Sequence, residues 1–156
     1  MKKIVLFDID YTLFDTDLFK ESDLTKHSLY EEVVGVLVEI ATHATLGIFS
    51  EGDMEFQRNK LMKTDIMNHF NEEDIHIFTE KTTPIPQVLN KYKDYKVFLV
   101  DDRPSILGKV KKNSPSVFTI FIDREKRIWK GDEPIDYSAD ATVSTLNEVI
   151  PLIVNN

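Results

Sequence analysis

The stretch FDIDYTLFDT, residues 7–16, follows the apolar run Ile4–Leu6 and places Asp8 and Asp10 one residue apart, just past what is typically a buried strand. Like charges held close together repel, and burying them costs free energy unless a cation or a proton compensates them. The pair therefore indicates either a solvated turn or a site where other groups supply positive charge.

Length and composition limit the possibilities. The 156 residues fit one domain, residues 1–156, with a full hydrophobic core. The chain has no cysteine, which excludes disulfides, zinc-thiolate sites and a cysteine nucleophile. No apolar run approaches the length of a transmembrane helix, and Asp8 interrupts the first run too early for a signal peptide. We therefore expect a cytoplasmic protein with no membrane partner.

The charge balance bears on partners. Nineteen Lys and Arg stand against 27 Asp and Glu, a net charge of −8. Proteins that bind duplex nucleic acid usually present a basic surface, so such a partner is disfavoured.

Short apolar runs alternate with amphipathic stretches along the chain. Runs rich in Val, Ile or Phe predict strands at residues 4–7, 45–49, 75–78, 97–100, 117–122 and 141–143. Helical spacing of apolar residues predicts helices at 28–43, 54–70, 85–92, 105–112 and 146–154. This alternation predicts an α/β fold, a three-layer α/β/α sandwich with a mostly parallel, Rossmann-like central sheet.

Ligands of such sheets bind outside the carboxyl ends of the strands. The residues that follow the first four predicted strands are Asp8, Asp10 and Thr12, then Ser50, Glu51, Gly52 and Asp53, then Thr79, Glu80 and Lys81, and finally Asp101, Asp102 and Arg103. Clustered carboxylates suit Mg²⁺, which prefers oxygen ligands and often binds together with substrate phosphate. A lysine and a hydroxyl beside them suit the phosphate itself.

Four segments carry a resemblance to a known family. DIDYT, residues 8–12, resembles the first motif, DxDx[TV], of the haloacid dehalogenase (HAD) superfamily, and GIFSEG, residues 47–52, resembles its second. Lys81 matches the lysine of the third motif, and FLVDDR, residues 98–103, resembles the fourth. The resemblance covers nearly the whole chain, since residues 139–153 are similar to the closing strand and helix of these enzymes.

The resemblance implies a magnesium-dependent phosphomonoester hydrolase. Asp8 would be the nucleophile and a metal ligand. Asp10 would act as general acid and then base, and its backbone carbonyl would bind the metal. An acid at the position of Asp10 goes with phosphatases and phosphotransferases of the superfamily, whereas dehalogenases lack it.

The other motifs imply the rest of the site. Ser50 and Lys81 would hold the phosphoryl oxygens, and Asp101 and Asp102 would complete the metal site. The sequence departs from common forms in two places: Thr82 follows the motif lysine, where proline is frequent, and Ser105 stands where another aspartate is frequent. The second departure leaves open whether Asp101 or Asp102 is the direct metal ligand.

Many members carry a cap domain inserted after the first or second motif. Residues 16–45 and 51–80 are too short for a separate domain, so we expect no cap and an open site. The loops at 17–26 and 124–137 are candidates for substrate contacts, and Trp129 could stack on a substrate or pack on the surface. The expected partner is a phosphorylated metabolite or macromolecule, and such enzymes sometimes form homo-oligomers.

Two other functions compete with a phosphatase. A non-catalytic HAD-fold module could bind phosphate or a protein, but it would not need both Asp8 and Asp10. A receiver domain of a signalling relay also combines acids, a hydroxyl and a lysine. Its adjacent acid pair follows the first strand, whereas here the adjacent pair follows the fourth predicted strand, which disfavours this class.

Overall fold

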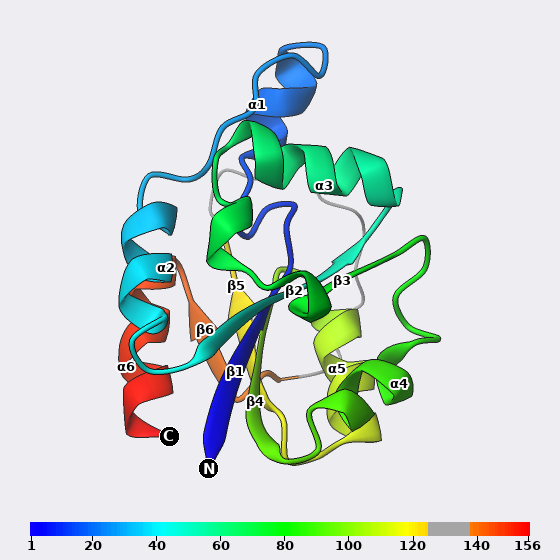
Figure 1. Cartoon of the computed structure of the whole chain (residues 1–156), viewed down its shortest axis with the longest axis vertical. Helices are drawn as coiled ribbons and strands as arrows, with labels where there is room; N and C mark the ends of the chain where they lie inside the picture. Colours follow the sequence, from blue (N-terminus) through cyan, green and yellow to red (C-terminus); the bar gives the residue numbers. More distant parts are fainter. Residues whose placement is uncertain (125–137) are drawn as a thin grey trace.

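The computed structural model describes residues 1–124 and 138–156, and its centre is one six-stranded parallel sheet (Figure 1). The strand order is β3-β2-β1-β4-β5-β6. The strands are β1 (Lys2–Phe7), β2 (Thr45–Glu51), β3 (Ile75–Phe78), β4 (Tyr95–Asp101), β5 (Phe118–Ile122) and β6 (Ala141–Val143). Each overlaps a strand predicted from the sequence, which confirms the parallel sheet.

Helices cover both faces of the sheet. The helices are α1 (Thr16–Glu21), α2 (Val33–Ile40), α3 (Met54–Lys63), α4 (Ile85–Lys91), α5 (Pro104–Asn113) and α6 (Val149–Asn155). Short 3₁₀ turns lie at Met67–His69, Glu72–Asp74 and Leu146–Glu148. Helices α2 and α6 contact each other on one side, and α4 and α5 do so on the other (Figure 1). This arrangement is the predicted α/β/α sandwich.

Strand β1 shows why apolar residues do not alternate with polar ones in the first apolar run. Successive side chains of a strand point to opposite faces of the sheet. Ile4 and Leu6 join the core under α4 and α5, whereas Val5 and Phe7 join the core under α2 and α6. All four are fully buried, as expected for a central strand of a sheet covered on both faces.

The topology predicts a ligand crevice at the carboxyl end of β1. The chain runs from β1 outward to β2 and β3, and then returns to the other side of β1 to form β4. Ligands of open parallel sheets bind where the strand order reverses in this way, outside the carboxyl ends. Phe7 pairs with Val100, so the residues that follow them, Asp8 and Asp101, lie at the same level.

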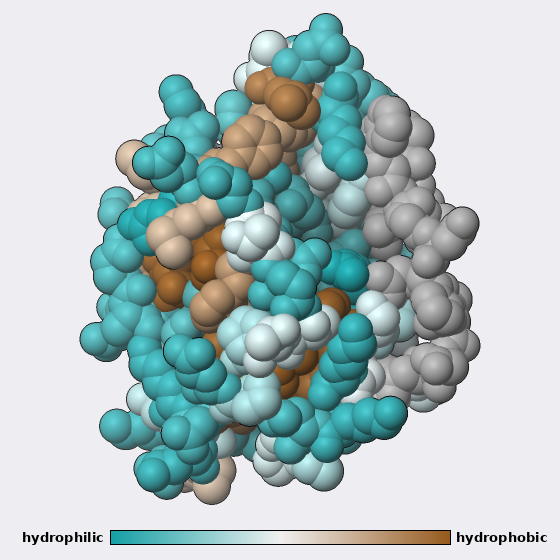
Figure 2. All heavy atoms as spheres, turned by 90° about the vertical axis from the view of Figure 1, so that its right-hand side faces the viewer, coloured by the Kyte–Doolittle hydropathy of each residue, from teal (hydrophilic) through white to brown (hydrophobic). Residues whose placement is uncertain are grey.

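The end of the molecule that carries this crevice also carries α1 and α3 (Figure 1). Four large apolar side chains among the described residues of this region are exposed, namely Leu24, Met54, Phe56 and Met62. Figure 2 shows brown and tan surface at this end and further brown patches about halfway down the same, mostly hydrophilic, face. The crevice therefore lies beside a surface that is partly apolar.

Two predicted helices are shorter than expected. The helix predicted at 28–43 begins only at Val33, because residues 28–32 bind the loop after β1 instead. Tyr30 donates its backbone N–H to the carbonyl of Leu13 over 3.1 Å. The helix predicted at 54–70 ends at Lys63, because Asp65 adopts a left-handed conformation with φ of 58°, which a right-handed helix does not tolerate.

The connections after β1 and β2 carry no separate domain within the described residues. The first holds α1 and α2, and the second holds α3 and two 3₁₀ turns, in agreement with the predicted absence of a cap. The segment predicted as a loop at 17–26 is helical in its first part, where α1 lies. The loop predicted at 124–137, with Trp129, lies outside the described residues except for Arg124. No described helix has the length and apolar character that spanning a membrane requires.

Candidate active site

The turn after β1 carries both aspartates of the first motif, Asp8 and Asp10, and backbone hydrogen bonds fix its shape. The backbone N–H of Asp8 donates to the carbonyl of Val100 over 3.0 Å, which fixes Asp8 beside β4. The N–H groups of residues 12, 13 and 14 all donate to the carbonyl of Ile9. Tyr11 closes the turn with φ of 60°, a left-handed value that costs energy for a bulky residue. The chain thus reverses sharply just after Asp10.

Arg124 secures the same turn from outside. Its guanidinium donates to the carbonyl of Thr12 and to the carboxylate of Glu32, both over 2.6 Å. It also lies 3.8 Å from the ring centroid of Tyr30. Arg124 is only 8% exposed, so this first residue of the predicted substrate loop faces the protein interior and supports the turn.

Three buried carboxylates meet at the crevice. Asp8, Asp101 and Asp102 each offer one oxygen, and these oxygens lie within 4.8 Å of one another. They come from the ends of the neighbouring strands β1 and β4, as the sequence predicts. The carboxylate of Asp10 does not belong to this group. Its expected metal contact goes through the backbone carbonyl and stays a prediction.

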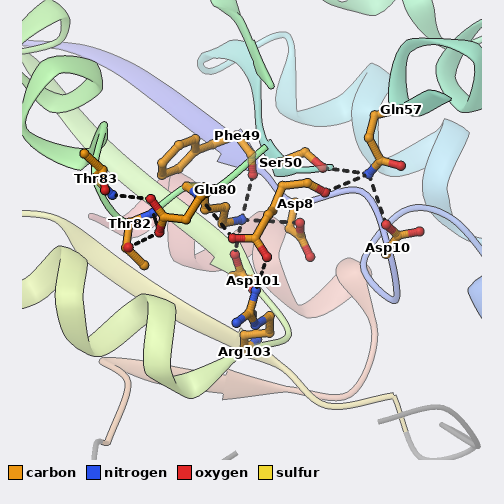
Figure 3. Close-up of polar contacts among 12 residues, drawn as sticks. Asp8, Asp10, Phe49, Ser50, Gln57, Glu80, Thr82, Thr83, Asp101 and Arg103 are labelled. Atoms are coloured by element: carbon orange, nitrogen blue, oxygen red, sulfur yellow. Dashed lines mark hydrogen bonds and ion pairs between the residues drawn. The ribbon is translucent and has the colours of Figure 1, made fainter. Parts of the chain in front are cut away.

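Lys81 is buried against this cluster. Its Nζ lies 2.6 Å from Asp101 Oδ2 and 3.3 Å from Asp8 Oδ1, and it donates to the carbonyl of Phe49 over 2.9 Å (Figure 3). Burial alone would lower the pKa of the Lys81 ammonium, but Asp101 and Asp8 outweigh burial and raise that pKa above its ordinary value. Lys81 therefore stays charged.

The carboxyl group of Asp101 lies beside both an ammonium and a second carboxylate. Burial and the neighbouring charge of Asp8 raise the pKa of Asp101 to about 6, even though Lys81 opposes this rise. Ionisation of Asp101 is therefore disfavoured in this buried cluster. Three buried carboxylates whose oxygens lie this close together are a donor set that suits a hard divalent cation such as Mg²⁺.

Ser50 lies at the same edge of the sheet, fully buried at the end of β2. Its hydroxyl accepts a hydrogen bond of 3.0 Å from the side-chain amide of Gln57, which also donates to Asp10 Oδ2 over 3.0 Å (Figure 3). Gly52, with φ of 144°, permits this arrangement, because an added Cβ would lie 2.9 Å from Cγ of Gln57. Gln57 thus connects Ser50 to Asp10.

Asp10 has a second partner from helix α3. Lys60 Nζ lies 2.7 Å from Asp10 Oδ1, and the Lys60 side chain is only 5% exposed. Sequence reasoning missed both Lys60 and Gln57. With Leu61 they have the i, i+3, i+4 spacing of one helix face, and that face is buried. The spacing puts the three residues on one face of the helix, but it does not show that this face is buried over the turn after β1, so the sequence alone could not assign Lys60 and Gln57 to the site.

An ion pair at the edge of the crevice links the strand ends. Arg103 Nη1 lies 3.0 Å from Glu51 Oε1, and Glu51 also accepts the backbone N–H of Lys81 over 3.1 Å. The side chain of Asp53, rather than Glu51, caps helix α3 by accepting the N–H of Phe56. Glu51 therefore ties the ends of β2 and β4 to the segment that carries Lys81.

No model of a known protein family matches the chain, and no curated protein matches it. Solved structures do. A haloacid dehalogenase-like hydrolase from Burkholderia xenovorans has a TM-score of 0.80 at 18% identity, with 99% of this chain and 98% of that chain covered.

Two further structures have the same fold. The HAD-hydrolase YfnB from Bacillus subtilis, bound to magnesium, has a TM-score of 0.72 at 12% identity, covering 97% of this chain and 98% of that one. The L-2-haloacid dehalogenase from Xanthobacter autotrophicus has a TM-score of 0.69 at 13% identity, covering 99% of each chain. Sheet order, motif positions and these likenesses agree: the chain has the fold of the haloacid dehalogenase-like hydrolases.

Proposed function

We propose that this protein is a magnesium-dependent phosphomonoester hydrolase that acts through an aspartyl-phosphate on Asp8. The observation that carries the proposal is the buried cluster of Asp8, Asp101 and Asp102 against Lys81 at the carboxyl ends of the strands. The fold does not choose the reaction, since dehalogenases share it. The acid at position 10 favours a phosphatase, because phosphoryl transfer to Asp8 requires a proton for the leaving group.

The proposed metal ligands are the carboxylates of Asp8, Asp101 and Asp102, with the backbone carbonyl of Asp10. The close spacing of their oxygens and the raised pKa of Asp101 support this assignment. When bound there, Mg²⁺ would neutralise charge on the phosphoryl oxygens and orient them toward the nucleophile.

The first proposed step transfers the phosphoryl group to the protein. A carboxylate oxygen of Asp8 attacks phosphorus, the bond from phosphorus to the ester oxygen breaks, and Asp10 gives its proton to that oxygen. Lys81 holds phosphoryl oxygens and offsets the charge of Asp8, which would otherwise repel the substrate. Ser50 would hold a further oxygen through its hydroxyl.

The second proposed step is hydrolysis of the aspartyl-phosphate. Asp10, now ionised, takes a proton from a water molecule that attacks phosphorus. The bond between phosphorus and Asp8 breaks, inorganic phosphate leaves, and both aspartates return to their starting states. The substrate would be a phosphorylated metabolite or macromolecule that reaches the open crevice directly.

Magnesium-dependent phosphate release from p-nitrophenyl phosphate tests the proposal, with wild type compared to Asp8→Asn purified in the same way. We expect activity that requires magnesium and vanishes in Asp8→Asn. Equal background in both proteins, with circular dichroism showing both folded, would contradict the proposal. It would favour a non-catalytic module that binds phosphate or a protein.

A further inference from the structure

We propose that Lys60 is a positioning residue that sets the direction of the Asp10 carboxylate. The inference rests on the proposed function, in which Asp10 gives and takes the proton. None of the motifs in the sequence includes Lys60, and its role follows from its surroundings in the structure.

Three side chains hold the Asp10 carboxylate by both oxygens. Oδ1 lies 2.7 Å from Lys60 Nζ and accepts the hydroxyl of Thr16 over 3.0 Å. Oδ2 accepts the side-chain amide of Gln57 over 3.0 Å (Figure 3). Thr16 belongs to α1, whereas Lys60 and Gln57 belong to α3. Lys60 supplies the charged contact among these, and hydrogen bonds from ionised donors are the stronger kind.

An aromatic cage fixes Lys60 in turn. Its Nζ lies 5.1 Å from the ring centroid of Phe14, 5.4 Å from that of Phe19 and 4.9 Å from that of Phe56. The rings also contact one another, with centroids 5.2 Å apart for Phe14 and Phe19 and 5.9 Å apart for Phe19 and Phe56. Cation–π attraction is strongest where the cation is shielded from water. The cage therefore holds the ammonium in one place.

The exposed fractions of the Lys60 and Asp10 side chains indicate that Lys60 acts through Asp10. The Lys60 side chain is 5% exposed, so it is shielded from a substrate, whereas the Asp10 side chain is 30% exposed. Misplacing a reacting group by about 1 Å can cost about a hundredfold in rate. A carboxylate on a sharp turn needs fixed partners to keep its direction. Lys60 is the charged partner among the three side chains that hold Asp10, and the aromatic cage fixes its position.

The experiment separates proton delivery from the rest of catalysis by using two aryl esters of similar size. Phenolate is a poor leaving group, with a conjugate-acid pKa near that of tyrosine, about 10. The nitro group makes p-nitrophenolate a far better one. In Lys60→Met we expect kcat/KM for phenyl phosphate to fall by about tenfold or more, within the range of general acid catalysis, and for p-nitrophenyl phosphate by less than about threefold.

Two further variants sharpen this test. Lys60→Arg keeps the charge and should recover part of the phenyl phosphate activity. Lys63→Met removes an exposed lysine of the same helix and should change neither rate. Equal losses on both esters in Lys60→Met, or no loss on either, would overturn the inference.

A double-mutant cycle tests whether Lys60 acts through Asp10. In an Asp10→Asn background, Lys60→Met should change kcat/KM for phenyl phosphate by less than about twofold, because the group it positions is already disabled. Full additivity would overturn the inference. If Lys60→Met does not fold, Lys60→Gln replaces it in the same cycle. Absence of Asp8-dependent activity in wild type would instead refute the proposed function.

Discussion

Replacing Lys81 with methionine removes the cation that lies between two buried carboxylates. Methionine keeps most of the apolar stem, so the loss is mainly of charge. Lys81 is 1% exposed and lies 2.6 Å from Asp101 and 3.3 Å from Asp8, so solvent screens the pairs little. Removing one partner of a buried ion pair typically lowers the free energy of unfolding by about 3–5 kcal/mol. For a chain of this size, that loss lowers Tm by roughly 6–20 °C.

The pH dependence separates charge from packing. Asp101 already has a raised pKa, and loss of Lys81 should raise it further, because the ammonium favours the ionised carboxylate. Below that pKa the carboxyl group binds a proton and no longer needs a cation. The destabilisation by Lys81→Met should therefore be largest at pH 8 and markedly smaller at pH 5.

The assay is urea unfolding followed by circular dichroism at pH 5 and pH 8, with EDTA present so that bound metal does not replace the lost charge. Lys93→Met, an exposed lysine, is the control and should change the free energy of unfolding by no more than about 0.5 kcal/mol. A loss at Lys81 that is below about 1 kcal/mol at pH 8, or that is equal at both pH values, would refute the reasoning.

Three other changes test separate parts of the structure. Without metal, wild type should lose stability relative to Asp101→Asn as pH rises from about 4 to about 6, because the folded protein favours the protonated form of Asp101. The raised pKa of Asp101 corresponds to a loss on the order of 3 kcal/mol. Calorimetry in the presence of EDTA measures this loss. Added magnesium should abolish this relative loss. Gly52→Ala should cost about 1–3 kcal/mol in urea unfolding and lower kcat, since the new Cβ displaces Gln57; unchanged kcat would count against a role for Gln57. Arg124→Met should cost about 3–5 kcal/mol in the same assay by leaving the carboxylate of Glu32 without its cation, and a loss like that of an exposed residue would contradict this account.

The strands could be predicted because their signal is local. Each is a short apolar run that matches a strand covered on both faces, and the parallel direction of the strands follows from their alternation with helices. The order of the strands in the sheet comes from the structure. The helix predicted at 28–43 shows the limit. Its apolar spacing is helical, yet Ser28 accepts the N–H of Asp15 over 2.8 Å and Tyr30 bonds to Leu13. These long-range bonds with the turn after β1 override local propensity.

The residues of the candidate site also divide into those that could be predicted from the sequence and those that could not. Asp8, Asp101 and Lys81 could be placed together because each follows a strand, and parallel strands bring their carboxyl ends to one edge. Lys60 could not be placed in the site from the sequence, because its position depends on how helix α3 packs over the turn after β1. Polar residues on a helix are usually read as solvent-facing, whereas here Lys60 finds a carboxylate and three aromatic rings inside the protein.

Detection of a phosphoryl group on Asp8 tests the central claim most directly. Asp10→Asn should slow hydrolysis of the intermediate, because no base then activates the water. After brief incubation of this variant with magnesium and p-nitrophenyl phosphate and an acid quench, mass spectrometry of peptides should find phosphate on Asp8. It should be absent without magnesium and absent in Asp8→Asn. Magnesium-dependent turnover by wild type, with no phosphate on Asp8 in the quenched variant or with phosphate on another residue, would contradict the account.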